Sequence, residues 1–342
     1  MQVTTLGLDL AKNIFQLHGV DADGNVVVRK KLGRAGLLAF FAKLPSCIVG
    51  IEACATAHYW ARELIALGHD VKLMPPAYVK PYVKRGKNDA ADAEAICEAV
   101  VRPTMRFVAV KSAEQQSLLM LHRSRDLLIR QRTMLANALR SHFAELGFIV
   151  AQGLRNLPRL VEIIRYDSDA RIPVIARHAL GLLVAQIEEL QGRIKDLEQA
   201  LIAWHRGNET SRRLETIPGI GVIIATAITA TVTDPSQFRS GRQFAAWLGL
   251  VPRQNSSGGK DRLGRISKMG DRYLRRLLVV GATALIRFAR NRTTPLAEWA
   301  EKLLSRRPAR LVSVALANKI ARVAWALLVR GGYYGSQLAP AA

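Results

Sequence analysis

Two apolar stretches near the N-terminus of this 342-residue chain each end at or contain an acid. Asp9 lies within Leu6-Gly-Leu-Asp-Leu-Ala-Lys12, and Glu52 ends Ile48-Val-Gly-Ile-Glu52. An ionised carboxylate inside an apolar strand costs several kcal/mol unless it is paired or binds a metal ion. The pattern therefore indicates a metal-binding pair or, as the plainer alternative, two acids at a sheet edge that face water.

A third group of acids follows in Lys87-Asn88-Asp89-Ala-Ala-Asp92-Ala-Glu94. Asp89 and Asp92 are three residues apart, so their side chains share one face of a helix. Carboxylate oxygens are preferred ligands of Mg²⁺ and Mn²⁺, and two such ions about 4 Å apart hold the attacking and leaving oxygens at a phosphate. We predict one divalent-metal site built from Asp9, Glu52, Asp89 and Asp92. Alternatively, Asp89 only caps its helix, and Asp92 and Glu94 favour the positive end of that helix.

Basic residues precede this acidic group and dominate the C-terminal third. Lys80, Lys84, Arg85 and Lys87 would draw a phosphate toward Asp89, although a solvated loop is a fair alternative. In all, 50 Lys and Arg against 27 Asp and Glu give a net charge of +23. Residues 1–110 and 111–206 each carry 14 basic and 10 acidic side chains, whereas residues 207–342 carry 22 and 7, a net of +15. A local excess of this size favours a nucleic acid as partner.

A serine pair lies within the basic region, in Arg253-Gln-Asn-Ser256-Ser257-Gly-Gly-Lys260. Neighbouring cations would stabilise a serine alkoxide and hold the phosphate that it attacks. Taken alone, Ser-Ser-Gly-Gly is more typical of a plain loop, and no histidine lies nearby in sequence to act as a base. The cations predicted to contact nucleic acid here are Arg253, Lys260, Arg262, Arg265, Lys268 and Arg272.

The segment Ile217-Pro-Gly219-Ile-Gly221 is similar to the turn of a helix-hairpin-helix motif. Glycine lets a backbone approach a phosphate closely, and the N–H groups at the start of the following helix bind anions. We predict that Gly219 and Gly221 contact the nucleic-acid backbone, a contact that carries no base specificity.

The elements that must position these residues follow from the apolar pattern. Strands are predicted over residues 3–10, 14–20, 26–28, 47–52 and 70–74, and helices over 37–44, 59–67 and 88–101. Three antiparallel strands followed by alternating helices and strands is the order of a ribonuclease-H-like fold. We predict such an α/β domain over residues 1–110.

The middle of the chain, residues 111–206, is predicted to be helical. One helix covers residues 112–146, and a second carries apolar side chains at alternating spacings of three and four, the pattern of a coiled coil. Pairing within one chain and dimerisation are both open. The connection around Pro158 and Pro173 is predicted to be irregular. The members of the apolar seam are Leu180, Leu183, Ile187, Leu190, Ile194, Leu197, Leu201 and Trp204.

The last predicted domain, residues 207–342, is mainly helical, with a polar loop over residues 255–265. A helix that Thr216-Ile-Pro-Gly-Ile-Gly-Val222 opens is expected to run to about Thr231, and further helices are expected over residues 236–249, 271–290 and 311–329. Three cysteines without a CxxC pair argue for reduced thiols and against a zinc site. The longest apolar run, residues 221–232, is too short to cross a membrane. We expect a cytoplasmic, nucleoid-associated protein with no membrane partner.

Several segments together resemble the DEDD-type transposases of insertion-sequence family 110, the bridge-RNA-guided recombinases, and their eleven-eleven branch most of all. The resemblance covers nearly the whole chain in the family's order. The matching segments are Gly7-Leu-Asp-Leu-Ala-Lys12, Gly50-Ile-Glu-Ala53, Lys87-Asn-Asp-Ala-Ala-Asp-Ala-Glu-Ala-Ile96, Ile217-Pro-Gly-Ile-Gly221 and Trp247-Leu-Gly-Leu-Val-Pro252 through Ser-Gly-Gly-Lys260 to Gly270-Asp-Arg-Tyr-Leu274.

The resemblance implies a RuvC-like N-terminal domain whose acidic tetrad is Asp9, Glu52, Asp89 and Asp92. It also implies a C-terminal transposase domain whose serine, here Ser257 with Ser256 as a possible substitute, links covalently to DNA. The expected partners are the DNA of the element ends and target, a guide RNA, and further copies of the chain in a dimer or tetramer.

Two other functions compete with a recombinase. A RuvC-like nuclease would resolve DNA junctions by hydrolysis, with water as nucleophile and no covalent step. A non-enzymatic coiled-coil scaffold would not need the acids together, so it predicts Asp9 and Glu52 more than about 10 Å from Asp92, too far to share metal ions.

Overall fold

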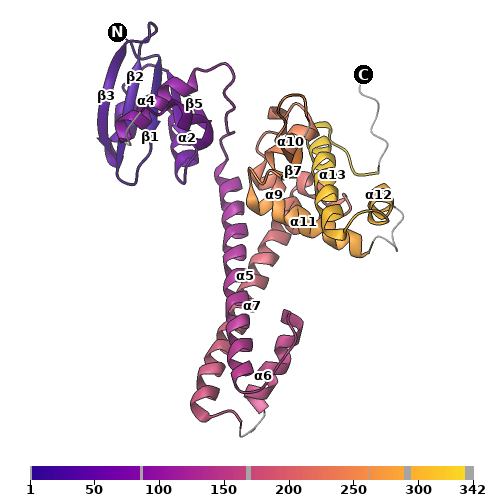
Figure 1. Cartoon of the computed structure of the whole chain (residues 1–342). Helices are drawn as coiled ribbons and strands as arrows, with labels where there is room; N and C mark the ends of the chain where they lie inside the picture. The colour runs from indigo at the N-terminus through magenta and orange to yellow at the C-terminus, as the bar shows by residue number, and fades with distance from the viewer. Residues whose placement is uncertain (1, 85–87, 167–170, 261, 289–293, 336–342) are drawn as a thin grey trace. The chain divides into compact units, whose positions relative to one another are not determined.

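The computed structural model describes residues 2–84, 88–166, 171–260, 262–288 and 294–335 (Figure 1). The chain divides into two compact units, Met1–Gln116 and Ser117–Ala342. A mixed α/β sheet forms the first unit, and helices make up most of the second. The fold class is therefore as predicted at this level, while a separate middle domain over residues 111–206 stays a prediction.

The sheet of the first unit has the strand order β3-β2-β1-β4-β5. β1, β2 and β3 are antiparallel neighbours, whereas β1, β4 and β5 run parallel to one another. The turn before β3 forms because the Asp21 carboxylate accepts from the N–H groups of Asp23 and Asn25. The bounds are β1 Thr5–Asp9, β2 Ile14–Val20, β3 Val26–Gly33, β4 Ile48–Glu52 and β5 Asp70–Met74.

Helices cover both faces of this sheet. On one face, α1 (Leu37–Phe41) and α2 (Ala57–Ala66) form a core with Leu6, Leu8 and Ile51. On the other face, α4 (Asp89–Val100) packs with α3 (Pro76–Val79) around Ile96 and Met74. A short 3₁₀ turn, Lys80–Tyr82, follows α3. The period-two alternation of each strand therefore decides which side chains meet α4.

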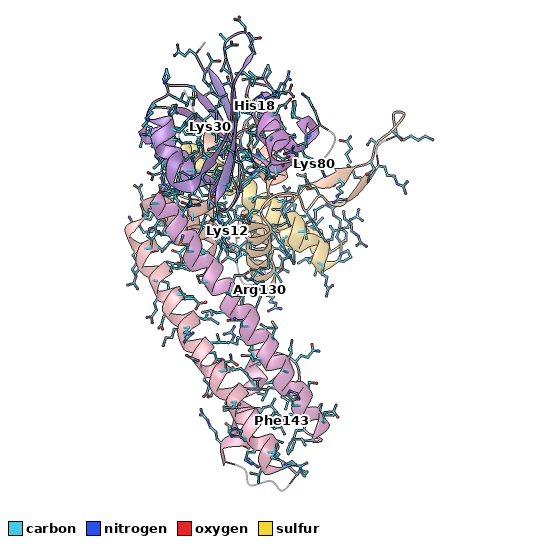
Figure 2. All side chains as sticks on the ribbon, turned by 90° about the vertical axis from the view of Figure 1, so that its left-hand side faces the viewer. Lys12, His18, Lys30, Lys80, Arg130 and Phe143 are labelled. Atoms are coloured by element: carbon cyan, nitrogen blue, oxygen red, sulfur yellow. The ribbon has the colours of Figure 1, made fainter. Side chains whose placement is uncertain are left out.

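Two long helices, α5 (Ala113–Glu145) and α7 (Val174–Gly207), form an antiparallel pair in the second unit (Figure 1). Phe143, near the tip of the pair in Figure 2, packs in one core with Leu180 and Ile187. The salt bridge between Arg125 and Glu198 joins the two helices at 2.5 Å. Five of the eight seam side chains are at most 6% exposed within the single chain, namely Leu180, Ile187, Leu190, Ile194 and Leu201. The seam is therefore packed mostly within one chain, which is the first of the two alternatives, pairing within a chain or dimerisation.

The predicted irregular connection between these helices is partly wrong, because it contains α6 (Leu157–Tyr166). Leu157 and Leu160 of α6 are buried beside Phe143. Pro158 lies in the first turn of α6, where a proline N–H would have no intrahelical partner in any case. Pro158 therefore lies at the start of a helix and not in an irregular connection.

Helices also build the rest of the second unit, around a large apolar core. The predicted polar loop over residues 255–265 is largely confirmed, because it connects the two strands of a hairpin, β6 (Pro252–Gln254) and β7 (Leu263–Ile266). Two helices, α8 and α12, were not predicted. The helices are α8 Glu209–Glu215, α9 Val222–Thr231, α10 Gly241–Trp247, α11 Arg272–Arg287, α12 Pro295–Leu304 and α13 Ala309–Arg330.

By length and composition, α13 is the one described helix that could cross a membrane. Its Val312, Leu316 and Ile320 side chains are fully buried in the core of the second unit. Burial against the surrounding helices gives a sufficient reason for the apolar composition.

A buried histidine ties α5 to the C-terminal helices. His122 is 0% exposed, and its ring nitrogens lie 3.0 Å from the Tyr273 hydroxyl and 3.1 Å from the Thr226 hydroxyl. Because the Thr226 hydroxyl donates to the Val222 carbonyl, it accepts from His122 Nε2–H, and Nδ1 accepts from Tyr273. Burial, with a smaller contribution from Arg125, lowers the pKa of His122 from 6.5 to about 4. The ring is therefore neutral in the folded protein at neutral pH.

We expect this histidine to destabilise the fold in acid. As the pH falls below 6.5, the unfolded chain takes up a proton that the folded ring binds only near pH 4. Between pH 7.5 and 5 the wild type should lose roughly 2 kcal/mol more unfolding free energy than His122→Asn, as measured by urea unfolding. His178→Asn, at an exposed position, is the control and should keep the wild-type pH dependence. Equal pH dependence in wild type and His122→Asn would contradict the assignment.

Candidate active site

Asp9 and Glu52 end neighbouring parallel strands, β1 and β4. The register pairs Gly7 with Gly50 and Leu8 with Ile51, so the two acids follow at the same edge of the sheet. Alternation places Asp9 on the face of Gly7, and Glu52 on the face of Gly50. Since α4 covers that face, both acids lie on its side of the sheet.

The two glycines make room for α4. A Cβ atom on Gly7 would lie 2.2 Å from the Ala93 carbonyl oxygen and 2.5 Å from the Cys97 nitrogen, both backbone atoms of α4. A Cβ on Gly50 would lie 2.9 Å from Cβ of Val100. The helix backbone therefore rests almost directly on the two strands. No function was predicted for these two glycines, although each stands two residues before an acid.

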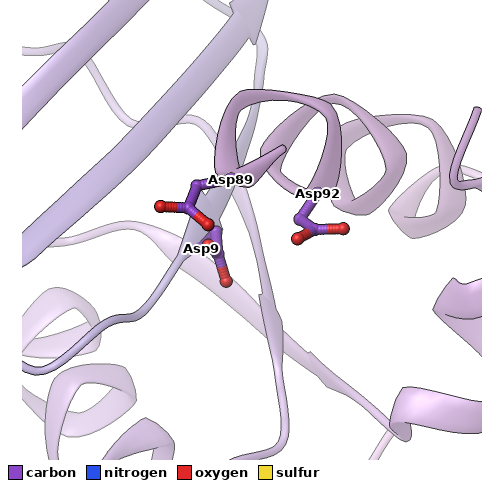
Figure 3. A group of neighbouring side chains, drawn as sticks. All are labelled: Asp9, Asp89 and Asp92. Carbon is purple, nitrogen blue, oxygen red and sulfur yellow. The ribbon is translucent and has the colours of Figure 1, made fainter. Parts of the chain in front are cut away.

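This contact brings Asp89 and Asp92 to Asp9. Asn88 caps α4 by accepting from the Ala90 N–H, which fixes where the first turn begins. One carboxylate oxygen from each of Asp9, Asp89 and Asp92 lies within 4.8 Å of the other two (Figure 3). Glu52 is outside this closest group but lines the same pocket as Asp9 and Asp92. The acids are thus together, contrary to the prediction of the scaffold hypothesis.

Burial and mutual repulsion raise the pKa values of two of these acids. The pKa of Asp9 rises from 3.8 to about 6 through burial first, and then through the charges of Asp92, Asp89 and Glu52. Burial and the charge of Asp92 raise the pKa of Glu52. A bound cation would relieve both the repulsion and the desolvation. Oxygen-only donors at this spacing fit a hard divalent cation and provide no thiolate or imidazole for a softer one.

Asp9, Glu52 and Asp92 line a pocket of about 380 Å³ with residues of α3 and the following turn. Lys80 is the one basic residue among the described residues that line it, and Figure 2 labels it on this unit. Of the basic run Lys80, Lys84, Arg85 and Lys87, Lys80 is the described member that lines the pocket. From this position the Lys80 ammonium group could bind a phosphate next to the carboxylates.

The other basic residues predicted to draw a phosphate toward the acids are Lys84, Arg85 and Lys87, and none of them is among the described residues that line the pocket. Lys84 forms a 2.5 Å salt bridge with Glu94, and this contact raises the pKa of Lys84 and lowers that of Glu94. The Lys84 side chain is 69% exposed, so the pair contributes little to stability. Arg85 and Lys87 lie outside the described residues.

The predicted serine segment forms the tip of the β6–β7 hairpin in the second unit. Gly258 and Gly259 have φ of 56° and 75°, and the Lys260 N–H donates to the Ser257 carbonyl at 3.1 Å. Positive φ at both central residues makes a type I′ turn, which only glycine, asparagine or aspartate adopt readily. The two glycines are therefore required by the turn that presents Ser257.

The two serines differ in their surroundings. The Ser256 hydroxyl accepts from the Arg262 N–H at 3.2 Å, across the hairpin. Ser257 is exposed, and among the described residues no hydrogen-bond partner of its hydroxyl is found. Ser256 thus has a structural contact, whereas Ser257 is open to an incoming group.

The predicted basic contacts of this region surround the hairpin. Arg253 donates to the Ser267 carbonyl at 3.3 Å, which fixes it on β6. The other five, Lys260, Arg262, Arg265, Lys268 and Arg272, are all exposed. Lys268 has an uncommon φ of 54°, in a tight crossing where a Cβ on Gly249 would lie 2.1 Å from the Met269 oxygen. This crossing anchors the base of the hairpin to the core.

The predicted helix-hairpin-helix turn has a packing function. Gly219 has φ of 90°, and its carbonyl oxygen would lie 2.0 Å from a Cβ on Gly281 of α11. The turn is therefore pressed against α11. Gly221 is exposed at the start of α9, and a phosphate contact at Gly219 and Gly221 stays a prediction.

Family models match both units of the chain. One described as "Transposase" matches residues 6–147, and one described as "Transposase IS116/IS110/IS902 family" matches residues 211–296. The first covers the acidic pocket and the second covers the serine hairpin.

Several proteins are similar over nearly their whole length. A "Probable family 20 transposase" of Pseudomonas aeruginosa is 51% identical over 335 residues, 98% of this chain and 99% of that protein. The "Transposase for insertion sequence element IS1328" of Yersinia enterocolitica is 41% identical, with 96% and 98% covered. The "Transposase for insertion sequence element IS1111A" of Coxiella burnetii is 39% identical, with 97% and 91% covered.

The fold, the acidic pocket and these matches define a transposase, an enzyme that cleaves and rejoins DNA and binds the ends of its element. The chain belongs to the IS116/IS110/IS902 family of insertion-sequence transposases.

The α4 contact gives a sharp prediction. In Gly7→Ala the new methyl group would meet helix backbone, so α4 and its two acids must shift. We expect a loss of about 1–3 kcal/mol in unfolding free energy and the loss of most DNA-cleavage activity. Gly36→Ala is the matched control, since nothing lies within 4 Å of its Cβ and its φ is −88°. Cleavage at the wild-type rate by Gly7→Ala would contradict this account.

Burial of Asp9 and repulsion from the neighbouring acids together predict a second result. Above pH 6, folding without metal forces Asp9 to hold a charge that its surroundings disfavour, and below pH 4 it does not. Asp9→Asn should therefore be more stable than wild type at pH 7.5, by about 1–2 kcal/mol after allowance for partial exposure, with the gap closing near pH 4. Added Mg²⁺ should stabilise the wild type and not Asp9→Asn. The exposed Asp23→Asn is the control, and a gap independent of pH would refute the repulsion.

Proposed function

We propose that this transposase is an RNA-guided recombinase that uses a metal-bound acidic tetrad and a serine nucleophile. The observation that carries the proposal is the convergence of Asp9, Glu52 and Asp92 on one pocket, with Asp89 within 4.8 Å of Asp9 and Asp92. The strand order β3-β2-β1-β4-β5, with α4 on one face, supports a RuvC-like or ribonuclease-H-like domain.

The four acids are the proposed ligands of Mg²⁺, with Mn²⁺ as the substitute. When bound, such an ion supplies charge stabilisation to the phosphate and to the oxygens that enter and leave. Lys80 would hold a phosphate oxygen at the open side of the pocket. The acids and α4 thus position the cleavage site, and the rigidity comes from the glycine contacts of β1 and β4.

Ser257 is the proposed nucleophile. Its oxygen would bond to the DNA phosphorus while the bond from phosphorus to the deoxyribose oxygen breaks, and the leaving oxygen takes a proton. The phosphoserine keeps the energy of the broken bond for rejoining, whereas hydrolysis would release it. Exposure at the tip of a rigid type I′ turn supports Ser257 over Ser256, whose hydroxyl is bonded to Arg262.

The serine proton needs an acceptor, and no histidine of the hairpin provides one. The proposal requires that the acidic pocket and the hairpin, from one protomer or two, act on the same phosphate. Homo-oligomerisation, as a dimer or tetramer, would allow this. The heptad seam is mostly buried within the chain, so other surfaces would have to mediate assembly.

The expected partners are the element ends, the target DNA and a guide RNA. The net charge of +15 over residues 207–342 supports binding of polyanions, and the family resemblance provides the reason for RNA. A cytoplasmic, nucleoid-associated location follows from these partners.

Covalent capture tests the proposal. With labelled element-end DNA, Mg²⁺ and the copurifying RNA, wild type should form a protein–DNA adduct on denaturing gels and exchange strands. Ser257→Ala should form no adduct and no recombinant product, while Ser256→Ala should retain both. Asp92→Asn should also form no adduct but should still bind DNA.

Other outcomes would redirect the assignment. An adduct in Ser257→Ala that disappears in Ser256→Ala would move the nucleophile by one residue. Mg²⁺-dependent cleavage by Ser257→Ala without any adduct would favour the hydrolytic junction-resolving nuclease. Digestion of the copurified nucleic acid by ribonuclease, with no effect on recombination, would remove the guide RNA from the proposal.

A further inference from the structure

A long groove runs along α13 in the second unit, beside the base of the β6–β7 hairpin. Its volume is about 1620 Å³, above the roughly 300–1,000 Å³ of sites for small molecules. We call this the α13 groove. Residues from the start of α10, from β7 and the segment after it, from α12 and from α13 line it. Its size indicates a polymeric occupant.

The basic residues of the groove come from three separate parts of the chain, and no acid is among its described lining residues. None of these six makes a salt bridge with a residue that the structure describes, in contrast to Arg125 and Arg165 of the helical pair. The charge of the groove is therefore not neutralised from within. The six are Arg242, Arg265, Lys268, Arg310, Lys319 and Arg322.

Lys319 is the most enclosed of these cations. Its ammonium group lies 4.6 Å from the centroid of the Trp299 ring, and burial together with the charge of Arg322 lowers its pKa. A cation held beside another cation without an acid is a costly arrangement. A bound anion would offset that cost.

Between its basic residues, the groove has an apolar floor. Leu311, 51% exposed, and Val314 and Ala315 of α13 contribute to it. In a duplex the base faces are stacked on one another, so only an unpaired strand offers base faces to such a floor. From Arg310 to Arg322 the helix rises about 18 Å, enough to face several consecutive phosphates.

We propose that the α13 groove binds an unpaired polynucleotide strand, with its phosphates on the six cations and its bases against the apolar floor. Arg265 and Lys268 belong both to the groove and to the basic surroundings of the hairpin, so a strand held here leads toward Ser257. This assignment extends the proposed recombinase function, but the binding itself depends on neither the acids nor Ser257.

Strand binding can be measured on the full-length protein by fluorescence anisotropy. The probes are a labelled 12-nucleotide oligothymidine, the matching oligouridine and a 12-base-pair duplex, at 0.15 M salt. The variant Arg310→Gln/Arg322→Gln removes two exposed cations from the groove. Its affinity for at least one single strand should fall by about tenfold or more, with a shallower salt dependence. The stronger binder of the two wild-type single-strand probes identifies DNA or RNA as the occupant.

A matched control separates the groove from total charge. Arg306→Gln/Arg330→Gln removes two exposed cations of the same unit that do not line the groove, and it should change single-strand affinity less than threefold. Lys319→Gln, with folding checked by thermal unfolding, should weaken single-strand binding as well. Ser257→Ala should bind the strands like wild type, so a failed covalent step and a failed groove are distinguishable.

Three results would overturn the proposal. Equal losses in the groove and control variants would reduce the effect to net charge. A loss for the duplex alone would make the groove a duplex surface. Unchanged strand binding in the groove variant, together with competition by an acidic helical peptide in the wild type, would assign the groove to a protein partner.

Discussion

The close contact between α4 and the backbone of β1 and β4 determines the geometry of the acidic pocket. Gly7 and Gly50 are neighbours in register, and together they leave a flat surface on the sheet. Only with that surface can the first turn of α4 approach the ends of both strands. Asp89 and Asp92 reach Asp9 because the helix cannot rest further from the sheet without losing its core contacts around Ile96.

Charge is distributed in opposite ways in the two units. The first concentrates carboxylates so tightly that the pKa of Asp9 rises to about 6, a state that a cation relieves. The second unit presents arginines and lysines that the described residues leave without acidic partners around the hairpin and the α13 groove. Each unit thus carries charge that its own fold does not neutralise, and DNA phosphate with a divalent ion complements both.

Predictions from local sequence patterns were wrong or incomplete where contacts with distant segments decide the structure. Pro158 indicated an irregular connection, yet α6 starts there because its apolar side chains are buried beside Phe143. The Ser-Ser-Gly-Gly segment correctly indicated a loop, but only the structure placed its glycines at positive φ in the turn of a hairpin. The heptad seam left pairing within or between chains open, since the pattern alone does not identify the partner helix; α5 buries it within the chain.

The sequence by itself determined the order of strands and helices in the first unit, the positions of the four acids and the family, because period-two alternation and short motifs are local properties. Only the tertiary structure decided that Glu52 is outside the closest acidic group, that Lys80 enters its pocket and that Gly219 packs against Gly281. The α13 groove is likewise tertiary, since its cations are distant in sequence and meet only when α10, β7 and α13 pack together. Such contacts depend on how helices pack across long loops, which spacing along the chain does not encode.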